Sequence, residues 1–151
     1  EKLTHLRQTV RFIVDRGVSH EFVRHRKMSI SQESTRYCNY AEERFNHEIT
    51  VIKPWYLDEG TESYALWKRQ CMSAEVAYFS LLNFDLMAQE VRAVLPHSTK
   101  TELMMTGTLE QWDHFFNLRA RQITGAAHPQ AAEVAIPLYM QFKAILPEVF
   151  A

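Results

Sequence analysis

Residues 6–14 read Leu-Arg-Gln-Thr-Val-Arg-Phe-Ile-Val, a stretch in which β-branched and aromatic residues partly alternate with polar ones. This pattern predicts a β-strand at the start of the fold. The Asp-Arg-Gly sequence at 15–17 indicates a turn, and Ser19 is suited to cap a short helix that ends near residue 24. The same criteria predict a polar loop at 27–32 and further strands near 34–38 and at 48–53.

The second half of the chain changes to helical spacing. Apolar residues recur at that spacing between residues 64 and 94, which predicts a long helix that ends before Pro96. Further helices are predicted at 98–105, 109–122 and 129–145, and Pro137 should kink or split the last one. Strands followed by helices predict an α+β fold, with an antiparallel or mixed sheet in the first third packed with several helices from the second half.

The composition is that of a globular domain, with 46% hydrophobic and 23% charged residues, and a length of 151 residues predicts a single domain. The net charge of −1 excludes a globally basic protein that coats nucleic acid. No apolar run approaches the roughly 18 residues of a transmembrane helix. Cys38 and Cys71 show no zinc-type or CxxC spacing, so we expect a reduced, soluble, cytoplasmic protein.

Positive charge is concentrated at residues 16–36, which contain five Lys or Arg against two acidic residues, together with several Ser and Thr. Arginine forks beside hydroxyl groups suit a phosphate or carboxylate ligand, because both supply directed donors. A solvated basic face and a short RNA- or DNA-binding patch are the alternatives.

Two catalytic arrangements are excluded by spacing. His20 and His25 resemble HExxH but are one residue too far apart. Five residues advance a helix by about 500°, so the two imidazoles would point about 140° apart and could not share a zinc ion. A Ser-His-Asp hydrolase is not indicated either, because no G-x-S-x-G sequence is present.

Three segments of the chain stand in a distinctive order. Arg24-His25-Arg26 is followed after seven residues by Ser34 and then by Arg36-Tyr37, residues 91–96 read Val-Arg-Ala-Val-Leu-Pro, and residues 112–119 read Trp-Asp-His-Phe-Phe-Asn-Leu-Arg. In this order they resemble the Arg-His-Arg-x7-Ser signature, the Ala-Arg-x-Val-Leu-Pro block and the Asn/His-Phe-x-x-x-Arg helix of the flavin-dependent thymidylate synthase family.

The resemblance implies roles for individual residues. Flavin-binding positions are Arg24, His25, Arg26, Gln32, Thr108, Glu110 and His114. Positions that bind the substrate dUMP are Glu21, Arg24, Gln32, Glu33, Ser34, Thr35, Arg36, Arg92 and Arg119. Arg119 would also be catalytic, since its permanent charge can stabilise negative charge that develops on the uracil ring. No metal is implied.

The implied activity is FAD-dependent conversion of dUMP to dTMP, with methylenetetrahydrofolate as carbon donor and NADPH as reductant. The signature residues include no obvious nucleophile, which fits chemistry carried by a cofactor. Cys38, next to the signature, is the weak alternative. The family further implies a homotetramer with shared active sites. A catalytically idle nucleotide- or flavin-binding relative and a basic RNA-binding module are the other function classes.

The chain also departs from the family pattern. Ser31-Gln32 stands in place of Asn-Glu, Glu21 in place of a frequent Gln, and Thr108 in place of Asn. The family's Ala-Gln-x-Glu-Ile block reads differently here, at 127–133. The His-x-Ser/Thr segment that precedes the first strand in the family has no counterpart. We therefore expect residues 1–151 to be a single catalytic domain that is N-terminally incomplete.

Overall fold

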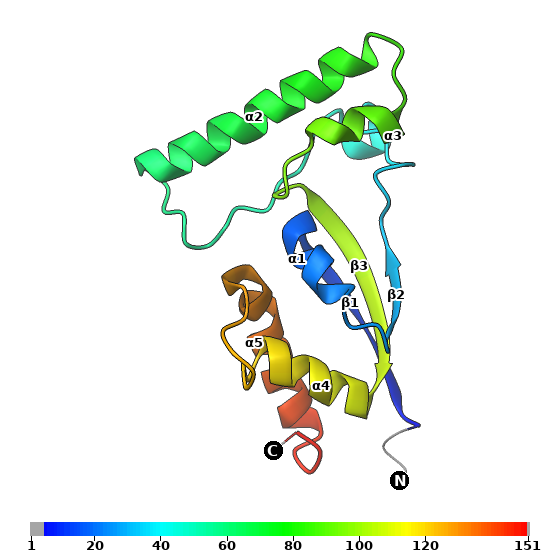
Figure 1. Cartoon of the computed structure of the whole chain (residues 1–151), viewed down its shortest axis with the longest axis vertical. Helices are drawn as coiled ribbons and strands as arrows, with labels where there is room; N and C mark the ends of the chain where they lie inside the picture. The colour runs from blue at the N-terminus through cyan, green and yellow to red at the C-terminus, as the bar shows by residue number, and fades with distance from the viewer. Residues whose placement is uncertain (1–4, 151) are drawn as a thin grey trace. The chain divides into compact units, whose positions relative to one another are not determined.

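The computed structural model describes residues 5–150 and has an α+β fold, which confirms the predicted class (Figure 1). Its elements are, in order, β1 (Arg7–Asp15), α1 (Arg16–Phe22), β2 (Ser29–Gln32), η2 (Glu43–Phe45), α2 (Glu62–Leu82), α3 (Ala88–Val91), η3 (Arg92–Val94), β3 (Lys100–Thr108), α4 (Leu109–Arg119) and α5 (Pro129–Ile145). The three strands form an antiparallel sheet in the order β1-β3-β2.

The chain divides into two compact units, and both take residues from separate parts of the sequence. Unit 1 contains residues 5–12, 18–31 and 103–150. Unit 2 contains Ile13–Gly17 and Gln32–Glu102. The strands β1 and β3 therefore each contribute residues to both units.

Unit 1 has an aromatic core built from one face of α4. Leu109, Trp112, Phe115 and Phe116 are the buried residues of this helix, and their three- and four-residue spacing aligns them on one side. Phe12 of β1 packs with its ring centroid 5.0 Å from that of Phe22, at the end of α1. The α5 helix lies beside α4 (Figure 1) and adds Phe142, whose centroid is 5.1 Å from that of Phe116.

Unit 2 has a smaller core beneath the long helix α2. Cys38, Tyr40, Tyr78 and Val91 form its buried cluster. The helix begins at Thr61, whose hydroxyl accepts a hydrogen bond from the Tyr64 amide at 3.2 Å. Only two of the 21 residues of α2 are buried, so most of the surface of this helix faces away from the core.

The expected helix at 98–105 is wrong, because this segment forms the strand β3. Burial alternates along it, with Thr101, Leu103 and Met105 buried and the residues between them more exposed. This period of two is hidden in the sequence, where Leu103-Met104-Met105 places three helix-favouring apolar residues together. The sheet is therefore not confined to the first third of the chain.

Four other local predictions are corrected. The expected turn at 15–17 and the expected cap at Ser19 are wrong, because β1 runs directly into α1 at Arg16 and Ser19 lies inside that helix. The expected loop at 27–32 contains β2, which is only four residues long and half-buried at alternate positions. The expected strand at 34–38 is a turn, in which the Tyr37 amide donates to the Ser34 carbonyl at 3.0 Å. The expected strand at 48–53 contributes only an isolated bridge between Val51 and Thr99.

The predicted helices in the last third of the chain are closer to the structure than the predicted strands. The α4 and α5 helices agree with the predicted segments, and α5 continues through Pro137 instead of splitting there. The predicted helix at 64–94 ends earlier, because Asp85 takes a left-handed backbone conformation with φ of 60° and the chain then restarts as α3. Across residues 5–150, every helix is too short or too polar to cross a membrane.

Candidate functional site

Unit 1 contains a cavity of about 440 Å³, a volume within the range of small-molecule sites. The cavity is formed by the segment after α1, the end of β3 and the first turns of α4. Its lining residues are His25, Lys27, Met28, Thr108, Glu110, Gln111 and His114. The structure thus brings four of the predicted flavin-binding residues, His25, Thr108, Glu110 and His114, to the same cavity.

Gln111 fixes two walls of this cavity against each other. Its Nε2 donates to the Lys27 carbonyl at 2.8 Å, and its Oε1 accepts from the Thr108 amide at 2.9 Å. The Thr108 hydroxyl accepts from the Gln111 amide at 3.3 Å, which completes a capping box at the start of α4. Gly107 permits this packing, because a Cβ there would lie 3.1 Å from Gln111 Oε1 and 2.7 Å from Met28 Cε.

Arg119, in the last turn of α4, contacts Glu21 near the end of α1 and His25, three residues beyond that helix. Its Nε donates to His25 Nε2 at 3.3 Å, and its Nη2 donates to the Glu21 carbonyl at 3.1 Å. Its Nη1 forms an ion pair with the Glu21 carboxylate. Arg119 therefore contacts two other predicted functional residues, Glu21 and His25, although Glu21 lies 98 positions away in the sequence.

His25 is held in its neutral form. Its side chain is buried, with the ring centroid 4.9 Å from that of Phe115 and 6.1 Å from that of His114. Burial, the charge of Arg119 and the nearby His114 lower the pKa of His25 from its ordinary value of 6.5 to about 4. A neutral imidazole nitrogen can accept a hydrogen bond, which is the role that the Arg119 contact requires.

Arg24 and Arg26 flank His25 on the surface of unit 1. Both are exposed, and neither is among the residues that line the cavity. The backbone around them is held by turns, since the His25 amide donates to the Phe22 carbonyl at 3.1 Å and the Met28 amide donates to the His25 carbonyl at 3.0 Å. The structure therefore places both guanidinium groups beside the cavity-lining residue but not on the cavity wall.

The predicted phosphate-binding residues gather in unit 2. The Ser34 hydroxyl accepts from the Arg36 amide at 3.3 Å, which holds the turn closed. Arg92 Nη1 donates to Thr35 Oγ1 at 3.4 Å, although the two residues are 57 positions apart. Arg36 and Arg92 are exposed and Thr35 is buried, so the guanidinium groups face solvent while the hydroxyl anchors one of them.

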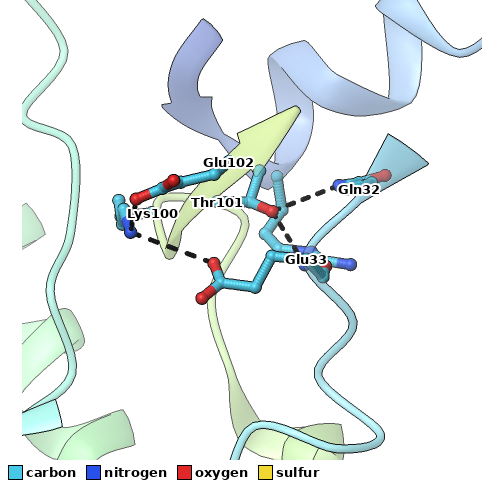
Figure 2. Close-up of polar contacts among 6 residues, drawn as sticks. Gln32, Glu33, Lys100, Thr101 and Glu102 are labelled. Atoms are coloured by element: carbon cyan, nitrogen blue, oxygen red, sulfur yellow. Dashed lines mark hydrogen bonds and ion pairs between the residues drawn. The ribbon is translucent and has the colours of Figure 1, made fainter. Parts of the chain in front are cut away.

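Gln32 and Glu33 lie at the end of β2, in unit 2. Gln32 Nε2 donates to Thr101 Oγ1 at 3.3 Å, and the Glu33 carboxylate is 4.0 Å from Lys100 Nζ (Figure 2). Lys100 also pairs with Glu102 at 2.7 Å. Figure 2 shows these side chains gathered at the start of β3, so the adjacent predicted residues 34–36 follow directly from an ordered strand end.

The cysteines are poorly suited to act as nucleophiles. Both thiols are free, Cys38 is buried and Cys71 is half-buried. Burial raises the pKa of both thiols above the ordinary value, which disfavours the reactive thiolate. Within residues 5–150, no group of three or more His, Cys, Asp or Glu side chains is arranged to hold a metal ion.

Three cavity residues were not predicted from the sequence: Lys27, Met28 and Gln111. The signal for Gln111 was present in Thr108-x-x-Gln111, since Ser or Thr followed three residues later by Glu or Gln is a helix-start pattern. Lys27 and Met28 stand directly after the arginine-histidine-arginine segment, and nothing in their types distinguishes them from ordinary loop residues.

The fold is similar to that of a solved structure. A crystal structure of a UMP/dUMP methylase, PolB from Streptomyces cacaoi, bound with 5-Br dUMP superposes with a TM-score of 0.77 and covers 98% of this chain and 71% of that chain. The sequence identity is 23%, so this likeness establishes a shared fold. The molecule therefore shares its fold with that protein.

The sequence comparisons define the family. Residues 2–148 match the family model described as thymidylate synthase complementing protein, and the chain belongs to this family. A flavin-dependent thymidylate synthase from Mycolicibacterium gilvum is 29% identical over 153 residues, which cover 91% of this chain and 58% of that protein. The corresponding enzyme from Pyrococcus furiosus is 34% identical over 104 residues, 69% of this chain and 42% of that protein. The chain spans about half the length of these relatives.

The neutral His25 predicts a pH-dependent stability. Between pH 6.5 and about 4 the unfolded chain binds a proton at this residue that the folded chain does not, so the free energy of unfolding falls as the pH falls. The loss attributable to His25 should be on the order of 2 kcal/mol after allowance for solvent screening. Urea unfolding at pH 6.5 and pH 4.5 measures it.

His25→Gln is the informative comparison, because glutamine keeps a polar side chain that cannot titrate. This variant should lose less stability than the wild type over the same pH interval. Equal losses in the two proteins would contradict the assignment of the acid sensitivity to His25.

Proposed function

We propose that this chain carries the catalytic residues of a flavin-dependent thymidylate synthase. The reaction is the conversion of dUMP to dTMP, with FAD as cofactor, methylenetetrahydrofolate as carbon donor and NADPH as reductant. We further propose that the chain forms one catalytic domain, that it assembles as a homotetramer with shared active sites, and that it is located in the cytoplasm. The relatives named flavin-dependent thymidylate synthase support it, and the observation that carries it is the lining of the unit 1 cavity.

The cavity residues fit a flavin. The neutral His25 ring offers a flat surface and Met28 a polarizable apolar one, while Lys27 supplies a cation for a phosphate group. The Glu110 carboxylate and the Thr108 hydroxyl can bind ring, sugar or amine donors and acceptors. His114 adds a second imidazole at the exposed edge. Arg24, Arg26 and Gln32 complete the proposed flavin set.

The unit 2 residues fit a nucleotide phosphate and sugar. Arg36 and Arg92 present exposed guanidinium groups, which are suited to bidentate contact with phosphate oxygens. The side chains of Ser34 and Thr35 supply hydroxyl groups beside them. We assign Gln32 and Glu33 to the same substrate, along with Glu21, Arg24 and Arg119 of unit 1.

Reduced FAD, when bound, supplies the hydride, so the protein's task is to bind, orient and stabilise charge. The guanidinium of Arg119 can stabilise negative charge on the uracil ring. Its present partners, Glu21 and His25, hold the guanidinium in one orientation before substrate arrives. The raised pKa of both thiols supports a reaction without a protein nucleophile.

Flavin binding is the first test. Purified protein, or protein reconstituted with FAD, should show flavin absorbance bands, and His114→Ala should weaken FAD binding about tenfold because it removes a donor from the cavity wall. Absorbance and fluorescence titrations measure both. His128→Ala is the matched control, since this exposed histidine precedes α5 and does not line the cavity. A protein of full family length that takes up no flavin would refute the proposed function.

Arg92 should determine dUMP affinity. Charge-assisted hydrogen bonds contribute about 1.5–3 kcal/mol, so Arg92→Ala should weaken dUMP binding about tenfold or more in titration calorimetry. Arg69→Ala is the control, because it removes the same charge from an exposed position in α2 of the same unit. Unchanged dUMP affinity in folded Arg92→Ala protein would remove this residue from the site. A preference for single-stranded RNA over dUMP would favour the binding-module alternative.

Turnover should require Arg119 and neither cysteine. Arg119→Lys retains a positive charge but not the planar fork that contacts Glu21 and His25, and the rate of dTMP formation should fall by about 10²–10³. The Cys38→Ala/Cys71→Ala double variant should form dTMP at a rate close to that of the wild type. Circular dichroism establishes that each variant is folded. A folded but inactive cysteine variant, or Arg119→Lys with a normal rate, contradicts these roles.

A further inference from the structure

We infer that Arg16 is a positioning residue for the segment Ser34–Arg36, the part of unit 2 proposed to bind the nucleotide. The inference rests on the proposed function, because it explains how the binding segment is kept in shape. Arg16 is the first residue of α1 and lies outside the motifs that identify the family. Its side chain nevertheless donates a hydrogen bond to Glu33, the residue directly before the segment Ser34–Arg36.

The backbone of Arg16 is itself well fixed. Its amide lies 2.9 Å from the His97 carbonyl and 3.0 Å from the Thr99 carbonyl, and donates to both. The amide of Gly17 also donates to the His97 carbonyl, at 3.3 Å. The side chain of Arg16 therefore starts from a rigid point at the junction of β1 and α1, and all of these residues belong to unit 2.

The guanidinium group joins two acceptors. Its Nη1 donates to the Glu33 carbonyl at 3.1 Å and to Thr101 Oγ1 at 3.2 Å. Thr101 has no exposed surface, and its hydroxyl also accepts from Gln32 Nε2 at 3.3 Å. Figure 2 shows the Thr101 hydroxyl facing Gln32, where β2 ends. A hydroxyl oxygen has two lone pairs, so it can accept from both donors.

These contacts hold the peptide groups on both sides of Glu33. Its amide donates to the Glu102 carbonyl at 2.9 Å, and its carbonyl accepts from Arg16. The chain then leaves the sheet in a turn, in which the amides of Tyr37 and Cys38 donate to the Ser34 carbonyl at 3.0 and 3.1 Å. Arg16 therefore fixes the peptide plane from which the turn starts, and with it the direction in which Ser34 and Arg36 leave the strand.

Hydrogen exchange gives a readout that does not depend on any ligand. Arg16→Met keeps the apolar stem of the side chain but removes its donors. In this variant the amides of Tyr37 and Cys38 should exchange about tenfold faster or more, because the turn opens locally. The amides of Phe45 and Asn46, in a separate turn of unit 2, should exchange as in the wild type.

Ligand binding gives the second readout. The same Arg16→Met protein should bind dUMP about tenfold more weakly, because a smaller fraction of molecules holds the binding conformation. Its FAD affinity should fall much less than its dUMP affinity, because the FAD cavity is lined by unit 1 residues and Gln32 is the single proposed flavin residue of unit 2. Arg16→Lys, which keeps a charged donor, should recover part of both effects and serves as the test protein if Arg16→Met does not fold.

Arg44→Met is the matched control. Arg44 is an exposed arginine of unit 2 that pairs with Glu42 at 2.8 Å, so its removal changes the charge of the unit equally while the Arg16 hydrogen bond to the Glu33 carbonyl is kept. This variant should match the wild type in amide exchange and in dUMP affinity. An equal effect in Arg44→Met would assign the change to net charge and overturn the inference.

The remaining outcomes separate the inference from the proposed function. Unchanged exchange of Tyr37 and Cys38 in folded Arg16→Met protein overturns the inference, and weakened dUMP binding alongside it would make Arg16 a direct ligand contact. If the wild type binds no dUMP but the Arg16 variant opens the turn, the proposed function fails and the positioning role stands. Faster exchange together with unchanged dUMP affinity overturns the role in binding.

Discussion

The contact of Arg119 with His25 and Glu21 is the interaction on which the unit 1 site depends. The Arg119 side chain is only 17% exposed, and a guanidinium in such a place needs hydrogen-bond acceptors to offset its loss of hydration. The Glu21 carbonyl, the Glu21 carboxylate and the His25 ring provide them. A protonated His25 could not accept this bond. Burial is the main cause of the low pKa of the imidazole, and the charge of Arg119 lowers this pKa further.

An element of this fold could be predicted from the sequence when its pattern of apolar and polar residues lies within one continuous segment. The first strand and the helices α4 and α5 were expected because their periods or composition are contained within one segment. The strand β3 was missed because its alternation only becomes visible when Thr101 and Gly107 are counted as inward-facing. Neither residue is strongly apolar, and their burial is set by the neighbouring strands and by Gln111 rather than by their own side chains.

The candidate site was only partly accessible from sequence for a related reason. Motif resemblance pointed to His25 and His114, which the structure places on the cavity, and to Arg119, which contacts His25. It did not point to Gln111 or Arg16, whose side chains donate to the backbone carbonyls of Lys27 and Glu33. A carbonyl partner carries no side-chain signature, so such supporting residues become recognisable only when the distant segments are seen together.

Pro137 shows how α5 accommodates a residue that normally interrupts a helix. A proline cannot donate to the carbonyl four residues earlier, which belongs here to Glu133. Both residues are exposed, whereas the buried side of the helix is formed by alanines such as Ala135 and by Phe142. Water can therefore hydrate the released carbonyl, so the helix loses one internal bond without leaving a dehydrated polar group. A helix of this kind tolerates a proline on its solvent side, while Ala135 and Phe142 pack on the other side.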